Sequence, residues 1–164
     1  MKTSLVVLSW VAASMASAGV PLAPGDVAPD FKRPSTTGQD VQLSELRGKK
    51  VVLAFFPKAG TPGCTKEMSA FRDRLAEFTS AGALVLGMSI DDIESQKKFA
   101  RDIQVTFPLL SDPGGEVAEA YGVRSLGFAK RVTFVIDKEG KISAVFDGKD
   151  ALDPAGALDA CKQK

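Results

Sequence analysis

Residues 51–64, VVLAFFPKAGTPGC, place an apolar strand, a short loop and the start of a helix in direct succession. The six apolar residues at its start have the length of a strand that is covered on both faces, and Pro57 ends the run. Thr61 and Pro62 then supply an N-cap hydroxyl and a proline at the first helical position. The stretch therefore predicts the central strand of an α/β sheet, followed by a helix that carries Cys64 in its first turn.

The apolar residues that follow Cys64 share one side of the predicted helix. Met68, Phe71, Leu75 and Phe78 recur at spacings of three and four residues, and Cys64 lies four residues before Met68. Such a stripe faces the sheet. We therefore expect the sulfur of Cys64 to be partly shielded from water.

The rest of the chain alternates predicted strands and helices. We expect a strand at 83–90, a helix from Asp92 to about Ile103, a helix opened by Asp112 and Pro113 and ending near Gly122, a hairpin of 132–136 with 142–146, and a helix at 154–161. Before residue 51 we expect an irregular lead-in, a strand around Phe31 and a short strand after a hairpin tip at 37–38. The pattern predicts one α/β domain, in which a right-handed crossover joins two parallel strands and an antiparallel hairpin completes the sheet.

The composition excludes several kinds of chemistry. The chain of 164 residues has no histidine, which excludes Ser-His-Asp triads, Cys-His pairs and His-ligated metals. With 21 Lys and Arg against 20 Asp and Glu, it lacks the positive charge of a nucleic-acid-binding protein. Its acidic residues are scattered, so we expect no metal site, and nothing indicates a cofactor.

The first 18 residues resemble a secretory signal. Lys2 is followed by an apolar segment at 5–13 and by Ala16-Ser17-Ala18, the small-residue pattern that precedes cleavage. We expect residues 1–18 to be removed, leaving residues 19–164 as one exported domain, periplasmic or secreted, without stable membrane insertion. The alternative is an uncleaved membrane anchor.

The position of Cys64 favours a thiolate. In the first turn of a helix, unpaired N–H groups and the positive end of the dipole lower the pKa of a thiol. A nearby cation would have to offset the desolvation of the charged sulfur. The alternative is that Cys64 is only a small buried apolar residue.

The segment 57–67, PKAGTPGCTKE, resembles the peroxidatic motif of peroxiredoxins, in the branch of the bacterioferritin comigratory protein, or Q type. The similarity continues through APDF (28–31), SID (89–91), FPLLSD (107–112), AYGV (120–123), RVTFVID (131–137) and GKI (140–142). The resemblance implies a thioredoxin-like fold, a central mixed sheet flanked by helices, and a thiol-dependent peroxidase that reduces hydrogen peroxide and organic hydroperoxides.

The resemblance also implies roles for four residues. Cys64 attacks the peroxide and becomes a sulfenic acid, Thr61 orients the peroxide, Pro57 shields the site from water, and Arg131 is the cation. From the residues alone, Arg131 could equally be a solvated charge at the end of a strand. The implied partners are a peroxide and a thiol reductant such as a thioredoxin-like protein, and the expected state is a monomer.

The sequence departs from its relatives at the resolving cysteine. Ser69 stands where many members of this branch carry that cysteine, and the predicted helix after Asp92 contains none. Only Cys161 remains, on the side of the last helix that we expect to be packed. Three hypotheses follow: an external thiol resolves Cys64, Cys161 forms a disulfide with it within or between chains, or the two cysteines form a structural bridge after export. We favour the external thiol.

Two other functions compete with the peroxidase. A thioredoxin-like disulfide oxidoreductase would share the fold, but the residue three positions after Cys64 is Glu67 rather than a second cysteine. A binding or holdase protein could keep the fold without efficient catalysis.

Overall fold

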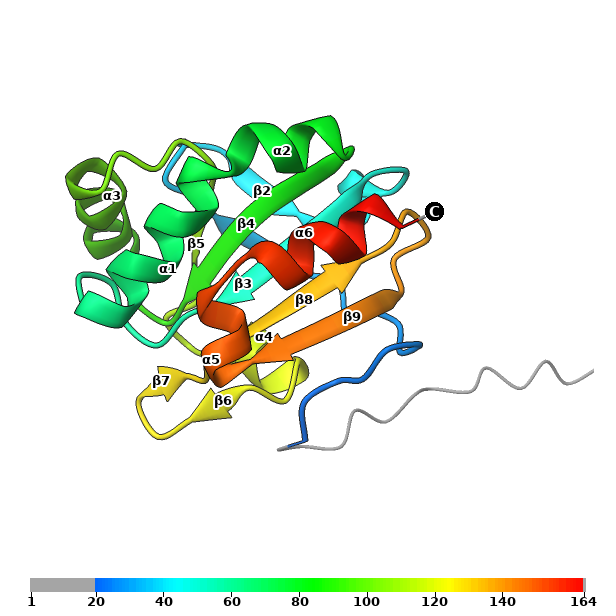
Figure 1. Cartoon of the computed structure of the whole chain (residues 1–164). Coiled ribbons are helices and arrows are strands. Elements are labelled where there is room, and N and C mark those ends of the chain that lie inside the picture. Colours follow the sequence, from blue (N-terminus) through cyan, green and yellow to red (C-terminus); the bar gives the residue numbers. More distant parts are fainter. Residues whose placement is uncertain (1–19, 164) are drawn as a thin grey trace, which may run out of the picture.

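The computed structural model describes residues 20–163, so the predicted signal at 1–18 lies outside the described residues. A five-stranded sheet in the order β5-β4-β3-β8-β9 forms the centre of the molecule (Figure 1). Its strands are β3 (Lys50–Phe55), β4 (Ala83–Ser89), β5 (Leu109–Ser111), β8 (Val132–Ile136) and β9 (Ile142–Asp147). The first three are parallel, whereas β8 runs antiparallel to β3 and β9 antiparallel to β8. The expected mixed α/β sheet is confirmed, with β3 at its centre.

Helices cover both faces of this sheet. The buried layer on one face is built with α1 (Pro62–Asp73), α2 (Leu75–Ser80), α3 (Ile93–Asp102) and α6 (Ala155–Lys162), and that on the other with α4 (Glu116–Ala120) and the N-terminal segment. The N-terminal segment contains β1 (Lys32–Pro34), β2 (Asp40–Gln42) and the 3-10 helix η1 (Leu43–Leu46). The remaining elements are a small hairpin of β6 (Arg124–Ser125) and β7 (Phe128–Ala129) and the short helix α5 (Gly148–Leu152). Within residues 20–163, no helix is long and apolar enough to cross a membrane.

Strand β3 contributes to two separate apolar layers because its side chains alternate between the faces of the sheet. Val51, Leu53 and Phe55 pack toward α4, whereas Val52 and Ala54 pack toward α1 and α6. All five side chains are buried. The strand is therefore covered on both faces, as its unbroken apolar run predicted.

Several elements differ from the expectation. The predicted long helix is interrupted at Arg74, whose backbone separates α1 from α2. The sheet has a third parallel strand, β5, and the short elements β6, β7 and α5 were not predicted. These pieces contain only two to five residues, too few to produce a clear periodic pattern.

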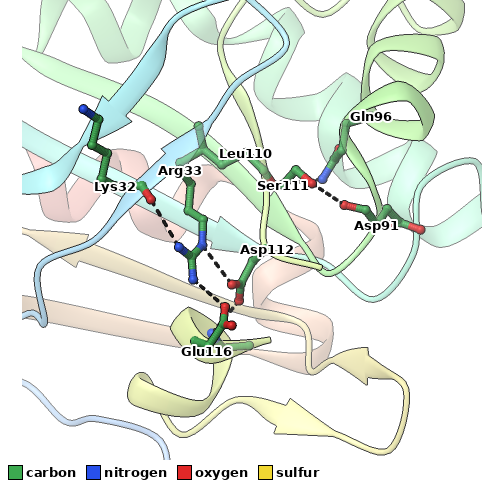
Figure 2. A network of polar contacts seen from close by, with 9 residues as sticks. Lys32, Arg33, Asp91, Gln96, Leu110, Ser111, Asp112 and Glu116 are labelled. Carbon is green, nitrogen blue, oxygen red and sulfur yellow. Dashed lines mark hydrogen bonds and ion pairs between the residues drawn. The ribbon is translucent and has the colours of Figure 1, made fainter. Parts of the chain in front are cut away.

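The short helix expected before Gly122 is present as α4, but the prediction that Asp112 and Pro113 open it is wrong. The N-cap of α4 is Gly115, with a positive φ of 70°, and Asp112 is instead buried. One carboxylate oxygen of Asp112 accepts the amide of Ala118 at 3.0 Å, and the other accepts Arg33 Nε at 3.0 Å. Figure 2 shows this ion pair between the N-terminal hairpin and the end of β5. Asp112 therefore ties distant segments together.

Candidate active site

Cys64 lies in the first turn of α1, at the end of the sheet where β3 finishes. Its side chain is 0% exposed and packs in the apolar layer with residues of β3 and with Met68 and Phe71 of α1. The stripe at spacings of three and four residues explains this burial, since it turns one side of α1 toward the sheet. The thiol is free in this structure.

The start of α1 leaves hydrogen-bond donors around this sulfur. Thr61 is the N-cap, as predicted, but its hydroxyl does not cap the helix and donates instead to the carbonyl of Lys58 at 3.0 Å. Within residues 20–163, the amides of Gly63 and Cys64 find no acceptor. Unpaired amides and the positive end of the dipole make the first turn of α1 favourable for an anion.

Arg131, at the start of β8, brings a positive charge to the sulfur. Its Nη2 donates toward Cys64 Sγ at 3.5 Å, and its Nη1 donates to Glu67 Oε2. The side chain is only 16% exposed, so Arg131 is not the solvated strand-end charge that the sequence left open. Burial opposes the charged form, but Glu67 and Cys64 outweigh it and raise the pKa of Arg131. A Cβ atom at Gly63 would lie 3.0 Å from Nη2, so the missing side chain at Gly63 makes room for the guanidinium.

Glu67 is a site residue that the sequence analysis did not identify. Its side chain is fully buried, and its Oε1 has no hydrogen-bond partner among the described residues. Burial raises the pKa of Glu67 to about 8, against the opposing charge and hydrogen bond of Arg131. The available signal was its spacing of three residues from Cys64, which places a carboxyl group on the apolar side of the helix.

Pro57 and Thr61 lie on the loop that joins β3 to α1. Pro57 is half-buried and lies two residues after the end of β3. The Thr61 amide donates to Lys58 O at 3.5 Å and Gly60 has a φ of 80°, which together describe a type II turn over residues 58–61. The loop therefore has a defined conformation that brings Thr61 to the start of α1.

Cys161 lies far from this site, on the packed side of α6, as its spacing predicted. Lys50, the first residue of β3, donates from Nζ to the Cys161 carbonyl at 2.5 Å, whereas Cys64 lies in the first turn of α1, after the loop that leaves the other end of the strand. Six strand residues span about 17 Å. A disulfide needs Cα atoms within about 7 Å, so the two sulfurs are not brought together. Burial raises the pKa of Cys161 to about 11, although the Lys50 charge opposes this.

The described residues contain no group of three or more His, Cys, Asp or Glu side chains arranged to hold a metal ion. The site thus consists of a thiol, a guanidinium, a buried carboxyl group and free backbone amides. These groups can hold a thiolate and stabilise negative charge that develops next to it.

Residues 24–145 match the AhpC/TSA family. A peroxiredoxin sequence of Mycobacterium tuberculosis is 46% identical over 130 residues, which cover 74% of this chain and 82% of that protein. Peroxiredoxin Bcp of Escherichia coli is 40% identical over 135 residues, covering 77% of this chain and 86% of the relative. Among solved structures, peroxidoxin BcpB of Mycobacterium tuberculosis superposes with a TM-score of 0.79 at 41% identity, covering 85% of this chain and 96% of the other.

Proposed function

This chain belongs to the AhpC/TSA family and is a peroxiredoxin of thioredoxin-like fold, a thiol-dependent peroxidase, and on that premise we propose that Cys64 is the thiol that attacks the peroxide. The observation that carries the proposal is the Arg131 guanidinium, 3.5 Å from a cysteine sulfur at a helix N-terminus. Burial raises the pKa of Cys161 to about 11, although the Lys50 charge opposes this, so its thiol does not ionise readily at neutral pH.

The proposed reaction transfers one oxygen atom to sulfur. The Cys64 thiolate attacks one oxygen of R–O–O–H, so that an S–O bond forms and the O–O bond breaks. The sulfur is oxidised to a sulfenic acid, and the departing RO⁻ takes up a proton and leaves as ROH. Negative charge moves from sulfur to oxygen in this step. Arg131 and the free amides at the start of α1 stabilise it.

The neighbouring residues position these groups. Thr61 orients the peroxide with its hydroxyl, which already lies at the start of α1, and Pro57 limits the access of water to the thiolate. Glu67 accepts a hydrogen bond from Nη1 of the guanidinium, while Nη2 of the same group faces Cys64. The carboxyl group thereby directs Nη2 toward the sulfur.

An external thiol completes the cycle. A thiolate attacks the sulfur of the sulfenic acid to form a mixed disulfide and releases water, and a second thiol then regenerates Cys64 as the new disulfide leaves. The distance between Cys64 and Cys161 along β3 supports an external thiol over an internal one. A thioredoxin-like protein has the required chemistry.

A pair of cysteine variants tests the proposal. We expect Cys64→Ser to abolish peroxide consumption in a stopped-flow assay, because serine has no thiolate to oxidise. Cys161→Ser should consume one equivalent of peroxide at the rate of the unmodified protein and turn over with dithiothreitol. Peroxide consumption by Cys64→Ser at the unmodified rate would refute the assignment.

Residues 1–18 support a further proposal about location. They have the pattern of a cleaved export signal, so the mature peroxidase would act in the periplasm or outside the cell. The family resemblance further indicates a monomer. The intact mass of the exported protein tests the cleavage, since a mature chain that retained Trp10 would refute it. Size-exclusion chromatography with light scattering tests the monomer.

A further inference from the structure

Asp91 follows the end of β4 and reaches across to the loop that precedes α1. Its Oδ2 accepts the Ala59 amide at 2.8 Å and the Ser89 hydroxyl at 2.6 Å. Within residues 20–163, the bond from Ala59 is the only hydrogen bond that joins residues 57–60 to a segment outside residues 56–65. The loop in front of Cys64 is therefore held to the rest of the protein at a single polar point.

The turn at residues 58–61 connects the Ala59–Asp91 hydrogen bond to the active site. Ala59 is the second residue of the type II turn, and the carbonyl of Lys58 before it accepts both the amide and the hydroxyl of Thr61. Thr61 in turn accepts the Thr65 amide at 2.9 Å and so begins α1. A displacement of Ala59 would thus move Thr61 and the first turn that carries Cys64.

Asp91 is itself fixed from three elements. The fully buried Gln96 of α3 donates to the Ser89 hydroxyl at 2.7 Å and to the Leu110 carbonyl of β5 at 3.0 Å. Ser111 donates to the backbone carbonyl of Asp91 at 2.7 Å. Figure 2 shows Gln96, Ser111 and Asp91 grouped between β5 and α3. The acceptor is therefore rigid, whereas the loop that it holds has one attachment.

The two halves of the catalytic cycle require different conformations of this loop. Peroxide attack needs Thr61, Arg131 and Cys64 in a fixed arrangement. Reduction needs a bulkier thiol to reach the sulfur of Cys64, which is 0% exposed. The loop and the first turn of α1 must therefore open before reduction and close again afterwards.

We propose that Asp91 is a positioning residue of the peroxidase reaction. Its bond to the Ala59 amide holds the loop closed for the peroxide step and is the bond that breaks when the oxidised sulfur is reduced. This inference rests on the proposed role of Cys64.

Two variants remove the bond from opposite sides. Asp91→Ala removes the acceptor, and Ala59→Pro removes the donor while suiting the second position of a type II turn. We expect each to slow peroxide consumption about tenfold or more, since a displacement of about 1 Å at a reacting group costs up to about a hundredfold. Both should speed the reduction of oxidised Cys64 by dithiothreitol several-fold. The double variant should be no worse than either single one, because both remove the same interaction.

Alkylation separates this local effect from loss of folding. We expect N-ethylmaleimide to label Cys64 faster in both variants, with labelling of Cys161 unchanged, as measured by peptide mass spectrometry. Asp91→Asn keeps an acceptor oxygen and should restore near-normal rates. The matched control is Asp92→Ala, which removes the carboxylate that caps α3 through Ser95 but makes no bond to the loop. This control should leave the labelling of Cys64 unchanged.

Three outcomes would overturn the inference: Asp91→Ala behaving like Asp92→Ala, Cys161 becoming labelled together with Cys64, or additive effects in the double variant. If Ala59→Pro does not fold, Asp91→Ala and its restoration by Asn still decide the matter. Failure of the proposed function would be distinct, since it would appear as peroxide consumption by Cys64→Ser.

Discussion

Glu67 places a carboxyl group in the apolar layer between α1 and the sheet, and this makes folding stability depend on pH. Burial raises its pKa from 4.5 to about 8. Between these values the folded protein keeps a proton that the unfolded chain releases. The stabilising contribution is therefore complete below pH 4.5 and is lost as the pH rises through 8.

We expect Glu67→Gln to remove this dependence, because glutamine keeps the hydrogen bond to Arg131 without titrating. The free energy of unfolding of the unmodified protein, relative to that of the variant, should fall by on the order of a few kcal/mol between pH 4.5 and 8. Urea unfolding at both pH values measures this difference. Parallel stability profiles for the two proteins would show that Glu67 does not titrate in this range.

Among single residues, the sequence identified those whose neighbours in the chain form a recognisable pattern. It missed those whose role depends on contacts with distant parts of the chain. Cys64 and Thr61 follow from a helix start that can be read within a few residues. Arg131 came only from the family resemblance, since 67 residues separate it from Cys64. Asp91 and Glu67 act through partners on other elements, so local periodicity gave them no role.

Helix α1 lies close to Arg131 at Gly63 and close to the sheet at Gly87. Gly63 allows a test of whether the position of the Arg131 guanidinium matters. In Gly63→Ala the new Cβ would lie 3.0 Å from Arg131 Nη2 and push it away from the sulfur. We expect peroxide consumption to slow, while stability changes by less than about 1 kcal/mol, because Gly63 lies in the first turn of α1, outside the helix interior where alanine is favoured most. Stopped-flow kinetics and urea unfolding of the same sample measure both. A normal rate would mean that the position of Arg131 is not critical.

Substitution of Gly87 is expected to lower stability rather than activity. A Cβ atom at Gly87 of β4 would lie 2.6 Å from Leu109 Cδ2 and 3.1 Å from Met68 Sδ. We expect Gly87→Ala to destabilise the protein by about 1–3 kcal/mol, the usual cost of overpacking a core. Thermal and urea unfolding should show this loss, and Leu109→Val in the same chain should restore part of it. Unchanged stability would indicate that α1 can move away from β4 freely.

Elements with a long apolar pattern were predicted well, as were the N-terminal hairpin of β1 and β2 and the short helix α4, whereas β5, β6, β7 and α5 were not. Strands β3, β4, β8 and β9 and helices α1, α3 and α6 lie close to their expected positions. Asp112 was misread because the combination of aspartate and proline is a local capping signal, whereas its carboxylate is satisfied by Arg33 and Ala118. A tertiary ion pair of this kind leaves no trace in the neighbouring residues.

At the scale of the whole molecule, the two cysteines lie at opposite ends of β3. We expect one equivalent of peroxide to convert Cys64 to a sulfenic acid, which adds one oxygen atom to the mass. A disulfide between Cys64 and Cys161 would instead remove two hydrogen atoms. Intact-mass and peptide mass spectrometry under native conditions, with dimedone to trap sulfenic acid, distinguish these products. The Cys161→Ser variant should give the same product, and an internal disulfide in the unmodified protein would contradict the external-thiol cycle.

The fold class and the central position of β3 followed from the sequence, as did the place of Cys64 in the first turn of the helix after β3. The order of all five strands did not, because β5 has only three residues and the pairing of strands is a long-range property. The same limit applies to the site: the place of Cys64 at a helix start was predictable from neighbouring residues, whereas Arg131 came only from the family resemblance and Glu67 was missed.

The long separation between Cys64 and Arg131 has a consequence for the newly made protein. An unfolded chain has neither the guanidinium nor the packed helix start beside the sulfur. Its thiol should therefore react with peroxide as slowly as the cysteine of an unstructured peptide. The surroundings proposed to activate Cys64 are assembled only when the tertiary structure is complete.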